Sequence, residues 1–196
     1  MPHIVAIGGP NGAGKSSAAP ALLDELFGIR AFVNADEVAA ELGDASSDRV
    51  AISAGRSVLQ RMRRLAASGA DFAFESTLAS RSFAPWISTL RGRQNYQFHV
   101  IFVSLPSPEM AIARVADRVA LGGHDIPVEI VRRRYGRSLR NLFELYIPLA
   151  QTWRVYDNST PRRPQLIAAG GEQMQTEVYD ELIFSSLREA VRGSQP

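Results

Sequence analysis

A glycine-rich loop near the amino terminus is the segment whose residue types and spacing are best suited to chemistry. Residues 9–16 match the pattern G-x-x-x-x-G-K-[ST], and Ser17 follows. The matching residues are Gly9, Pro10, Asn11, Gly12, Ala13, Gly14, Lys15 and Ser16. Glycines let a loop turn its backbone N–H groups around phosphate oxygens, and the helix expected after it adds free N–H groups and the positive end of its dipole. In this pattern the lysine reaches the β- and γ-phosphates, and the serine hydroxyl ligates Mg²⁺. We therefore predict that residues 9–17 bind a nucleotide, with Ser16 as the metal ligand.

The composition supports this interpretation and excludes other chemistries. Lys15 is the only lysine among 22 basic residues, so the one lysine of an arginine-rich chain stands inside the loop. The chain has no cysteine, which excludes disulfides, thiolate zinc sites, iron–sulfur clusters and a cysteine nucleophile. No apolar run approaches the roughly 20 residues that span a bilayer, and no secretory signal is visible. We expect a cytoplasmic protein that does not engage a membrane.

Apolar segments alternate with helical patterns along the 196 residues. The predicted strands lie at 3–8, 31–36, 71–75, 98–105 and 153–157, with a late one at 165–169. The predicted helices lie at 15–26, 37–42, 51–68, 84–90, 108–121, 127–145 and 176–192. This alternation is typical of a parallel sheet covered on both faces, in which ligands bind at the carboxyl ends of the strands. The residues that follow each strand are therefore expected to meet in one crevice.

Two carboxylates follow predicted strands and are candidates for catalysis. Asp36 ends the second strand, where a carboxylate can accept the proton of an attacking hydroxyl. The alternative is that Asp36 or Asn34 only caps the short helix that follows. Glu75 ends the third strand, where it can hold the Mg²⁺ shell through water or bind a substrate hydroxyl. Ser76 and Thr77 come next and either contribute to binding or cap the following helix.

An arginine-rich segment between residues 114 and 134 is the next candidate. Kinases need cations that close over the transferring phosphoryl group and exclude water. Arg118 and one of the three arginines at 132–134 fit such a lid, and a solvated basic face is the alternative. His124 lies in the turn between two helices, where it either touches a phosphate or positions the lid; the alternative is a structural role. Asn158 follows the fifth strand, where kinases hold the adenine edge, unless it marks a plain turn.

With these residues assembled, the chain resembles the zeta-toxin family of P-loop kinases. The matching stretches are GGPNGAGKSS at 8–17, NADE at 34–37, FESTL at 74–78, RVADRVALGGHDIPVEIVRRRYGRSLRNL at 114–142 and VYDNS at 155–159. The GGHDIP…RRRY…SLRNL stretch is the more specific of these, because the glycine-rich loop alone occurs in many families. The chain is similar to the free-standing chromosomal branch, since its lid carries GGHDIP where the plasmid toxins have a longer segment.

The resemblance implies a fold, an activity and a set of roles. The implied fold is a three-layer α/β domain over residues 1–196, with a parallel five-stranded sheet in the order 2-3-1-4-5 and a helical lid near 114–142. The implied activity is ATP- and Mg²⁺-dependent phosphorylation of a nucleotide sugar, which for the toxins is UDP-N-acetylglucosamine at its sugar 3′-hydroxyl. Asp36 matches the catalytic base, Glu75 a substrate-binding carboxylate, and Arg118 and Arg134 the arginines that clamp phosphate. Arg114 or Arg133 are alternatives for the clamp. An antitoxin partner is a further expectation.

Three other functions fit parts of the pattern. A kinase of another small metabolite, such as a sugar, a nucleoside or an antibiotic, would use the same Asp36 and Glu75. A nucleic-acid end kinase is disfavoured, because the net charge is only +2 and aromatic residues make up only 8% of the chain. A nucleotide-binding regulatory protein that acts through a partner would bind ATP without phosphorylating an acceptor.

Overall fold

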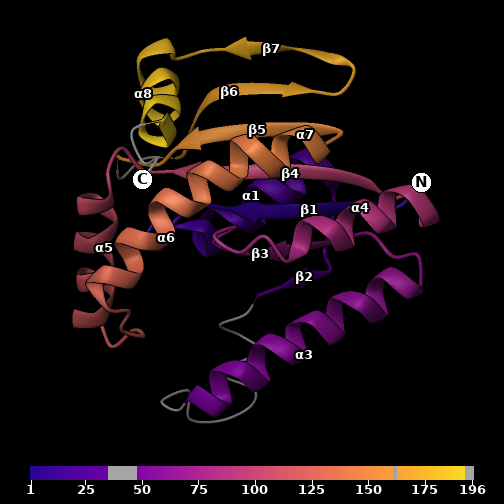
Figure 1. The fold of residues 1–196 in the computed structure, drawn as a ribbon, viewed down its shortest axis with the longest axis horizontal. Coiled ribbons are helices and arrows are strands. Elements are labelled where there is room, and N and C mark those ends of the chain that lie inside the picture. Colours follow the sequence, from indigo (N-terminus) through magenta and orange to yellow (C-terminus); the bar gives the residue numbers. More distant parts are fainter. Residues whose placement is uncertain (35–47, 161–162, 193–196) are drawn as a thin grey trace.

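One mixed sheet organises the protein. The computed structural model describes residues 1–34, 48–160 and 163–192. Within these ranges the sheet has seven strands in the order β2-β3-β1-β4-β5-β6-β7 (Figure 1). The strands are β1 His3–Gly8, β2 Phe32–Val33, β3 Phe72–Glu75, β4 Gln97–Ser104, β5 Thr152–Asp157, β6 Gln165–Gly171 and β7 Met174–Val178. The first five strands are parallel, whereas β6 and β7 pair antiparallel at one edge. The predicted order 2-3-1-4-5 is thus confirmed for the parallel part.

Helices cover both faces of this sheet, as predicted for a three-layer fold. They are α1 Lys15–Phe27, α3 Asp48–Ala67, α4 Phe83–Gln94, α5 Pro108–Ala120, α6 Val128–Asn141, the π-helix η1 Leu142–Tyr146, α7 Ile147–Leu149 and α8 Glu181–Arg192. Figure 1 shows α4 and α6 on one side of the sheet and α1 on the other. None of the described helices combines the length and apolar character needed to cross a membrane.

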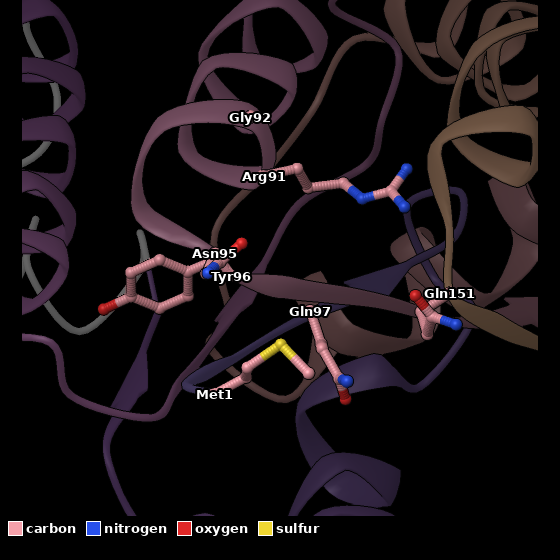
Figure 2. A pocket seen from close by; sticks show the side chains of 7 residues that line it. All are labelled: Met1, Arg91, Gly92, Asn95, Tyr96, Gln97 and Gln151. Atoms are coloured by element: carbon pink, nitrogen blue, oxygen red, sulfur yellow. The ribbon is translucent and has the colours of Figure 1, made fainter.

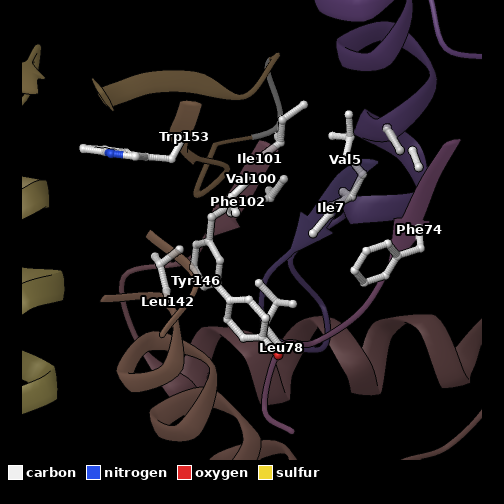
Figure 3. Packing of buried hydrophobic residues seen from close by; sticks show 14 of the residues in the cluster. Val5, Ile7, Phe74, Leu78, Val100, Ile101, Phe102, Leu142, Tyr146 and Trp153 are labelled. Atoms are coloured by element: carbon white, nitrogen blue, oxygen red, sulfur yellow. The ribbon is translucent and has the colours of Figure 1, made fainter. Parts of the chain in front are cut away.

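The core lies on the two central strands. Residues 4–8 of β1 and 98–104 of β4 are buried, which is the pattern of parallel strands covered on both faces. Figure 3 shows Val5, Ile7 and Phe102 of these strands in one cluster with Leu142 and Tyr146 of η1. Each such side chain stabilises the fold by about 1.5–3 kcal/mol when it is fully buried. The buried strands therefore hold the loops that follow their carboxyl ends in fixed positions.

The carboxyl-terminal region differs from the prediction. Residues 176–192 were expected to form one helix, but α8 begins only at Glu181 and the preceding residues form β7, which pairs with β6. The β-branched Thr176 and Val178 favour this strand. Asp180 sets the start of the helix, because its Oδ1 accepts a hydrogen bond from the Ile183 N–H at 3.0 Å. The sheet consequently has seven strands rather than five.

The helix predicted at 127–145 is also interrupted. The α-helix ends at Asn141 and continues as the π-helix η1 and then α7. Pro148 lies inside α7, about two turns after Asn141, and lacks the backbone N–H that a regular α-helix would use there. A smaller difference is that β2 spans only Phe32–Val33 within the strand predicted at 31–36. The helix expected at 37–42 lies outside the described residues.

Candidate active site

The parallel strands bring the predicted residues to one edge of the sheet. Ile7 of β1 pairs with Glu75 of β3, so the glycine-rich loop starts beside Glu75. On the other side Ser104 of β4 pairs with Asp157 of β5, which places Asn158 at the same edge. The register therefore confirms the expectation that the loop, the end of the third strand and the end of the fifth strand are neighbours.

The loop from residue 9 to residue 14 has a backbone that only glycine adopts easily. Gly9, Gly12 and Gly14 have φ angles of 143°, 76° and 77°. A Cβ at Gly9 would lie 2.2 Å from the carbonyl oxygen of Val103 in β4, and one at Gly12 would lie 2.7 Å from that of Ala111 in α5. Backbone oxygens at such distances cannot move aside cheaply, so both glycines are required by close packing as well as by φ. The loop ends at Gly14 and α1 begins at Lys15, and the amino end of a helix favours an anion through its dipole and its N–H groups.

Lys15, Ser16 and Glu75 form one polar cluster at the start of α1. The Ser16 Oγ donates a hydrogen bond of 2.7 Å to Oε2 of Glu75, and the Lys15 Nζ lies 3.7 Å from Oε1 of the same carboxylate. The Lys15 Nζ also donates to the carbonyl oxygen of Pro10 at 3.0 Å. The side chains of Lys15 and Glu75 are only 7% and 12% exposed. Buried charges of this kind need partners, and here each supplies one for the other.

This cluster has the donor set that Mg²⁺ prefers. A serine hydroxyl and a carboxylate stand 2.7 Å apart beside the amino end of a helix that favours phosphate. Magnesium takes hard oxygen ligands and is usually held by one or two protein groups plus phosphates and water. Ser16, with Glu75 behind it, therefore fits the metal that the glycine-rich loop implies.

Asn158 joins β5 to the loop. Its Nδ2 donates to the carbonyl oxygen of Ala13 at 2.8 Å, and it lies against Gly14, where a Cβ would come within 2.6 Å of that nitrogen. A cavity of about 500 Å³ opens beside it, lined by Gly14, Ser17, Ala18, Arg114, Asn158, Thr160, Arg163 and Pro164. Its position next to the helix start fits the nucleoside part of a nucleotide whose phosphates lie on the loop.

Arg114 is the arginine of α5 that reaches this cavity. Its Nη2 donates to the carbonyl oxygen of Ser159 at 3.0 Å, and its Cβ is 3.2 Å from the Cβ position of Gly12. Sequence reasoning gave Arg114 only as an alternative to Arg118. It placed Asp157 only as part of the 157–159 segment after the fifth strand, where this buried residue's Oδ2 accepts from the Ser159 N–H at 3.2 Å, and it gave no role to Arg163. No local pattern marks Arg163, because its place at the cavity depends on the turn after β5.

The loop after Glu75 is held by hydrogen bonds of its own and by contacts with α6 and η1. The side chains of Ser76 and Thr77 accept hydrogen bonds from the N–H groups of Leu78 and Ala79, so they stabilise this turn rather than cap α4, whose N-cap is Ser82. Leu78 is fully buried with φ of 54°, an uncommon conformation for a large side chain. Asn141 of α6 holds its carbonyl, because the Asn141 Nδ2 donates to the Leu78 oxygen at 2.8 Å.

Tyr146 of η1 extends this anchoring. Its hydroxyl donates to the carbonyl oxygen of Ser80 at 2.7 Å, and burial raises the pKa of Tyr146 to about 12. The phenol therefore keeps its proton and its role as a donor at every physiological pH. Figure 3 shows Leu78 and Tyr146 close together at this junction. The loop that carries Thr77 is thus tied to α6 and η1, the helical segment that also carries Arg134.

The predicted lid arginines have different surroundings. The Arg118 Nη2 donates to the carbonyl oxygen of His124 at 2.7 Å, so this guanidinium closes the turn after α5. Arg134 on α6 is half-buried, and burial together with the charge of Arg133 lowers its pKa. A bound anion would offset both effects. Arg132 instead pairs with Glu109 on the surface.

Two further predicted residues complete the set. Asn34 is buried directly after β2, at the same edge of the sheet. Asp36, the predicted base, lies outside the described residues.

A second depression lies at the opposite end of the sheet (Figure 2). It has a volume of about 350 Å³ and is lined by Met1, Arg91, Gly92, Asn95, Tyr96, Gln97 and Gln151. Its main polar groups already have partners within the fold. The Tyr96 hydroxyl donates to the carbonyl oxygen of Ala70 at 2.9 Å, and Arg91 binds the Leu149 carbonyl and the Glu172 carboxylate. We therefore assign these residues a structural role and do not propose a ligand site there.

Comparisons with solved structures show which folds this chain resembles. In solved structures, the chain aligns with AvrRxo1-ORF1:-ORF2 bound to ATP at a TM-score of 0.73 and 16% identity, covering 95% of this chain and 63% of that one. The PezAT toxin–antitoxin system of Streptococcus pneumoniae gives 0.64 and 17%, covering 100% and 80%. A putative kinase of Chloroflexus aurantiacus gives 0.62 and 18%, covering 99% of each chain. At these identities the likeness concerns the fold, and the chain spans less than two thirds of the first of these structures.

Sequence comparison gives the family directly. An uncharacterized protein of Haemophilus influenzae is 27% identical over 127 residues, which is 65% of this chain and 88% of the relative. The family model described as Zeta toxin matches residues 1–161, from the first strand through the turn that follows Asn158. The chain therefore belongs to the zeta-toxin family.

Proposed function

We propose that the protein is an ATP- and Mg²⁺-dependent kinase that transfers the γ-phosphoryl group to a sugar hydroxyl of a UDP-sugar such as UDP-N-acetylglucosamine. The observation that carries the proposal is the cluster of Lys15, Ser16 and Glu75 at the carboxyl edge of a parallel sheet, in a chain of the zeta-toxin family. Zeta-toxin membership supports the phosphotransferase class, and the resemblance to the toxins supports the UDP-sugar.

The proposed reaction assigns one task to each group. The acceptor oxygen forms a bond to the γ-phosphorus while the bond from that phosphorus to the β–γ bridging oxygen breaks, which releases ADP. Asp36 accepts the proton of the acceptor hydroxyl. Lys15 stabilises the negative charge on the β- and γ-phosphates. Bound Mg²⁺ supplies further neutralisation of the phosphate charge when held at Ser16.

The remaining residues bind the nucleotide and the acceptor and close over the site. The nucleotide occupies residues 9–17, with its nucleoside toward Asn158 and Arg114 in the cavity of about 500 Å³. Asn34, Glu75 and Thr77 face the acceptor side. The segment 114–142 closes over the site, with Arg134 as the guanidinium on the phosphoryl group. The Arg118 Nη2 donates to the His124 carbonyl oxygen at 2.7 Å, so its proposed contact with phosphate requires that bond to break on closure.

A direct assay tests this proposal. The purified protein is incubated with ATP, Mg²⁺ and a pool of nucleotide sugars, and mass spectrometry is used to find a product heavier by one phosphate. Lys15→Ala and Asp36→Asn should abolish the product, whereas Asp71→Asn, which removes a carboxylate at the other end of β3, should leave it. ATP binding without any phosphorylated UDP-sugar would refute the acceptor and favour another small metabolite.

A partner is also proposed. The solved relatives include the PezAT toxin–antitoxin system and the AvrRxo1-ORF1:-ORF2 complex, so an antitoxin-like protein is the partner class to test. The product of a small neighbouring open reading frame, if present, should copurify with this chain and inhibit the kinase. Full activity in its presence would refute an antitoxin role.

A further inference from the structure

Glu75 contacts the serine and the lysine of the glycine-rich P-loop (residues 9–17) in a way that the kinase reaction alone does not require. One carboxylate oxygen accepts the Ser16 hydroxyl at 2.7 Å, and the other lies 3.7 Å from the Lys15 ammonium. These are the two side chains that phosphate and metal must take over. The carboxylate is 12% exposed, so its charge is only partly screened by water.

This position has opposite consequences for the two forms of the nucleotide. A metal-free triphosphate brings several negative charges to the loop and meets the Glu75 carboxylate at close range, besides competing with it for Lys15. A triphosphate that arrives with Mg²⁺ brings a cation that attracts the same carboxylate and takes the Ser16 hydroxyl as a ligand. The sign of the interaction with Glu75 therefore depends on the metal.

We propose that Glu75 makes the P-loop selective for the metal-bound form of the nucleotide, as a specificity-determining residue distinct from its role toward the acceptor. This inference rests on the proposed binding of ATP at residues 9–17. Coupling between two ligands at one protein is commonly about 5- to 150-fold. We expect metal-free ATP to bind the wild-type protein more weakly than Mg²⁺–ATP by a factor in that range.

Neutralising the Glu75 carboxylate separates the effect of its charge from the contribution that Mg²⁺ makes to ATP affinity in any case. Glu75→Gln keeps the size of the side chain and an oxygen that accepts from Ser16, but removes the charge. The affinity for metal-free ATP should rise, and the ratio between the two forms should shrink several-fold. Glu75→Asp retains the charge and should retain most of the ratio. Asp71→Asn is the matched control, because it removes one negative charge about 13 Å away at the start of the same strand.

The experiment is a calorimetric titration of each full-length variant with ATP, once with excess Mg²⁺ and once with EDTA. Circular dichroism and thermal unfolding confirm that each variant is folded. An unchanged ratio in Glu75→Gln, or a loss of affinity for metal-free ATP in that variant, would overturn the inference while leaving ATP binding intact. Absence of ATP binding by the wild type under both conditions, or binding that persists in Lys15→Ala, would instead refute the proposed function.

Discussion

Acid should destabilise the protein through His99, a histidine buried in the middle of the sheet. Its Nδ1 lies 2.8 Å from the Thr152 hydroxyl of β5, and its Nε2 lies 3.0 Å from Nδ1 of His3 in β1. The ring is 5% exposed and packs against Phe27 of α1 at 4.7 Å between centroids. Burial, then the charges of His3 and Arg154, lower the pKa of His99 from 6.5 to about 4.

The sign of the effect follows from the direction of this change. In the unfolded chain His99 takes up a proton as the pH falls through about 6.5, whereas in the folded protein it stays neutral until about pH 4. The unfolded state therefore binds more protons in this window, so stability is fully present above pH 6.5 and is lost as the pH falls toward 4. The difference amounts to on the order of 3 kcal/mol, which is a large part of the 5–15 kcal/mol typical of a domain.

Urea unfolding between about pH 7.5 and pH 4 measures this contribution. The wild type should lose stability in the acid range, and His99→Gln should lose less, because glutamine forms hydrogen bonds without titrating. His124→Gln, in the exposed turn between α5 and α6, is the matched control and should follow the wild type. Equal pH dependence of the wild type and His99→Gln would show that another group causes the acid sensitivity and would refute the reasoning.

Four other substitutions test the packing, two at the site and two on the surface. Gly12→Ala places a Cβ 2.7 Å from the Ala111 oxygen at a φ of 76°, so it should abolish ATP binding in a calorimetric titration. Gly92→Ala, on the exposed side of α4, has free space for its Cβ and should stabilise the fold by about 0.5–1 kcal/mol in urea unfolding. Asn141→Ala leaves the Leu78 carbonyl without its donor and should cost about 1–3 kcal/mol in the same experiment. Arg132→Ala breaks only an exposed ion pair and should change stability by less than about 1 kcal/mol.

The parts predicted correctly from sequence are those that local patterns determine. The P-loop is contiguous, and its glycines, lysine and serine must lie between a strand and a helix for it to bind phosphate. The apolar runs of β1 and β4 are long enough to identify as buried parallel strands. Because parallel strands end at one edge, Glu75 and Asn158 were expected beside the loop, and the register confirms it.

The parts that could not be predicted depend on contacts between distant segments. β7 and α8 share one stretch whose helical pattern continues into the strand, and only the pairing of β7 with β6 decides where the strand ends and the helix begins. Which arginine of α5 faces the P-loop depends on how that helix is rotated against the sheet. Arg114 faces it, and Arg118 binds the His124 carbonyl, although both stand on the same helix one turn apart.

The conformation of the P-loop is itself a property of the whole fold. Gly9 packs against Val103 of β4, Gly12 against Ala111 of α5, and the Ala13 carbonyl accepts a hydrogen bond from Asn158 after β5. The motif thus specifies a backbone that segments roughly 90 to 145 residues further along the chain must complete. Since ATP would bind only the completed loop, it should stabilise the fold by about 2.7 kcal/mol at 100 times its Kd. We expect this stabilisation to disappear in Lys15→Ala, and an equal rise in Tm for that variant would place the nucleotide elsewhere.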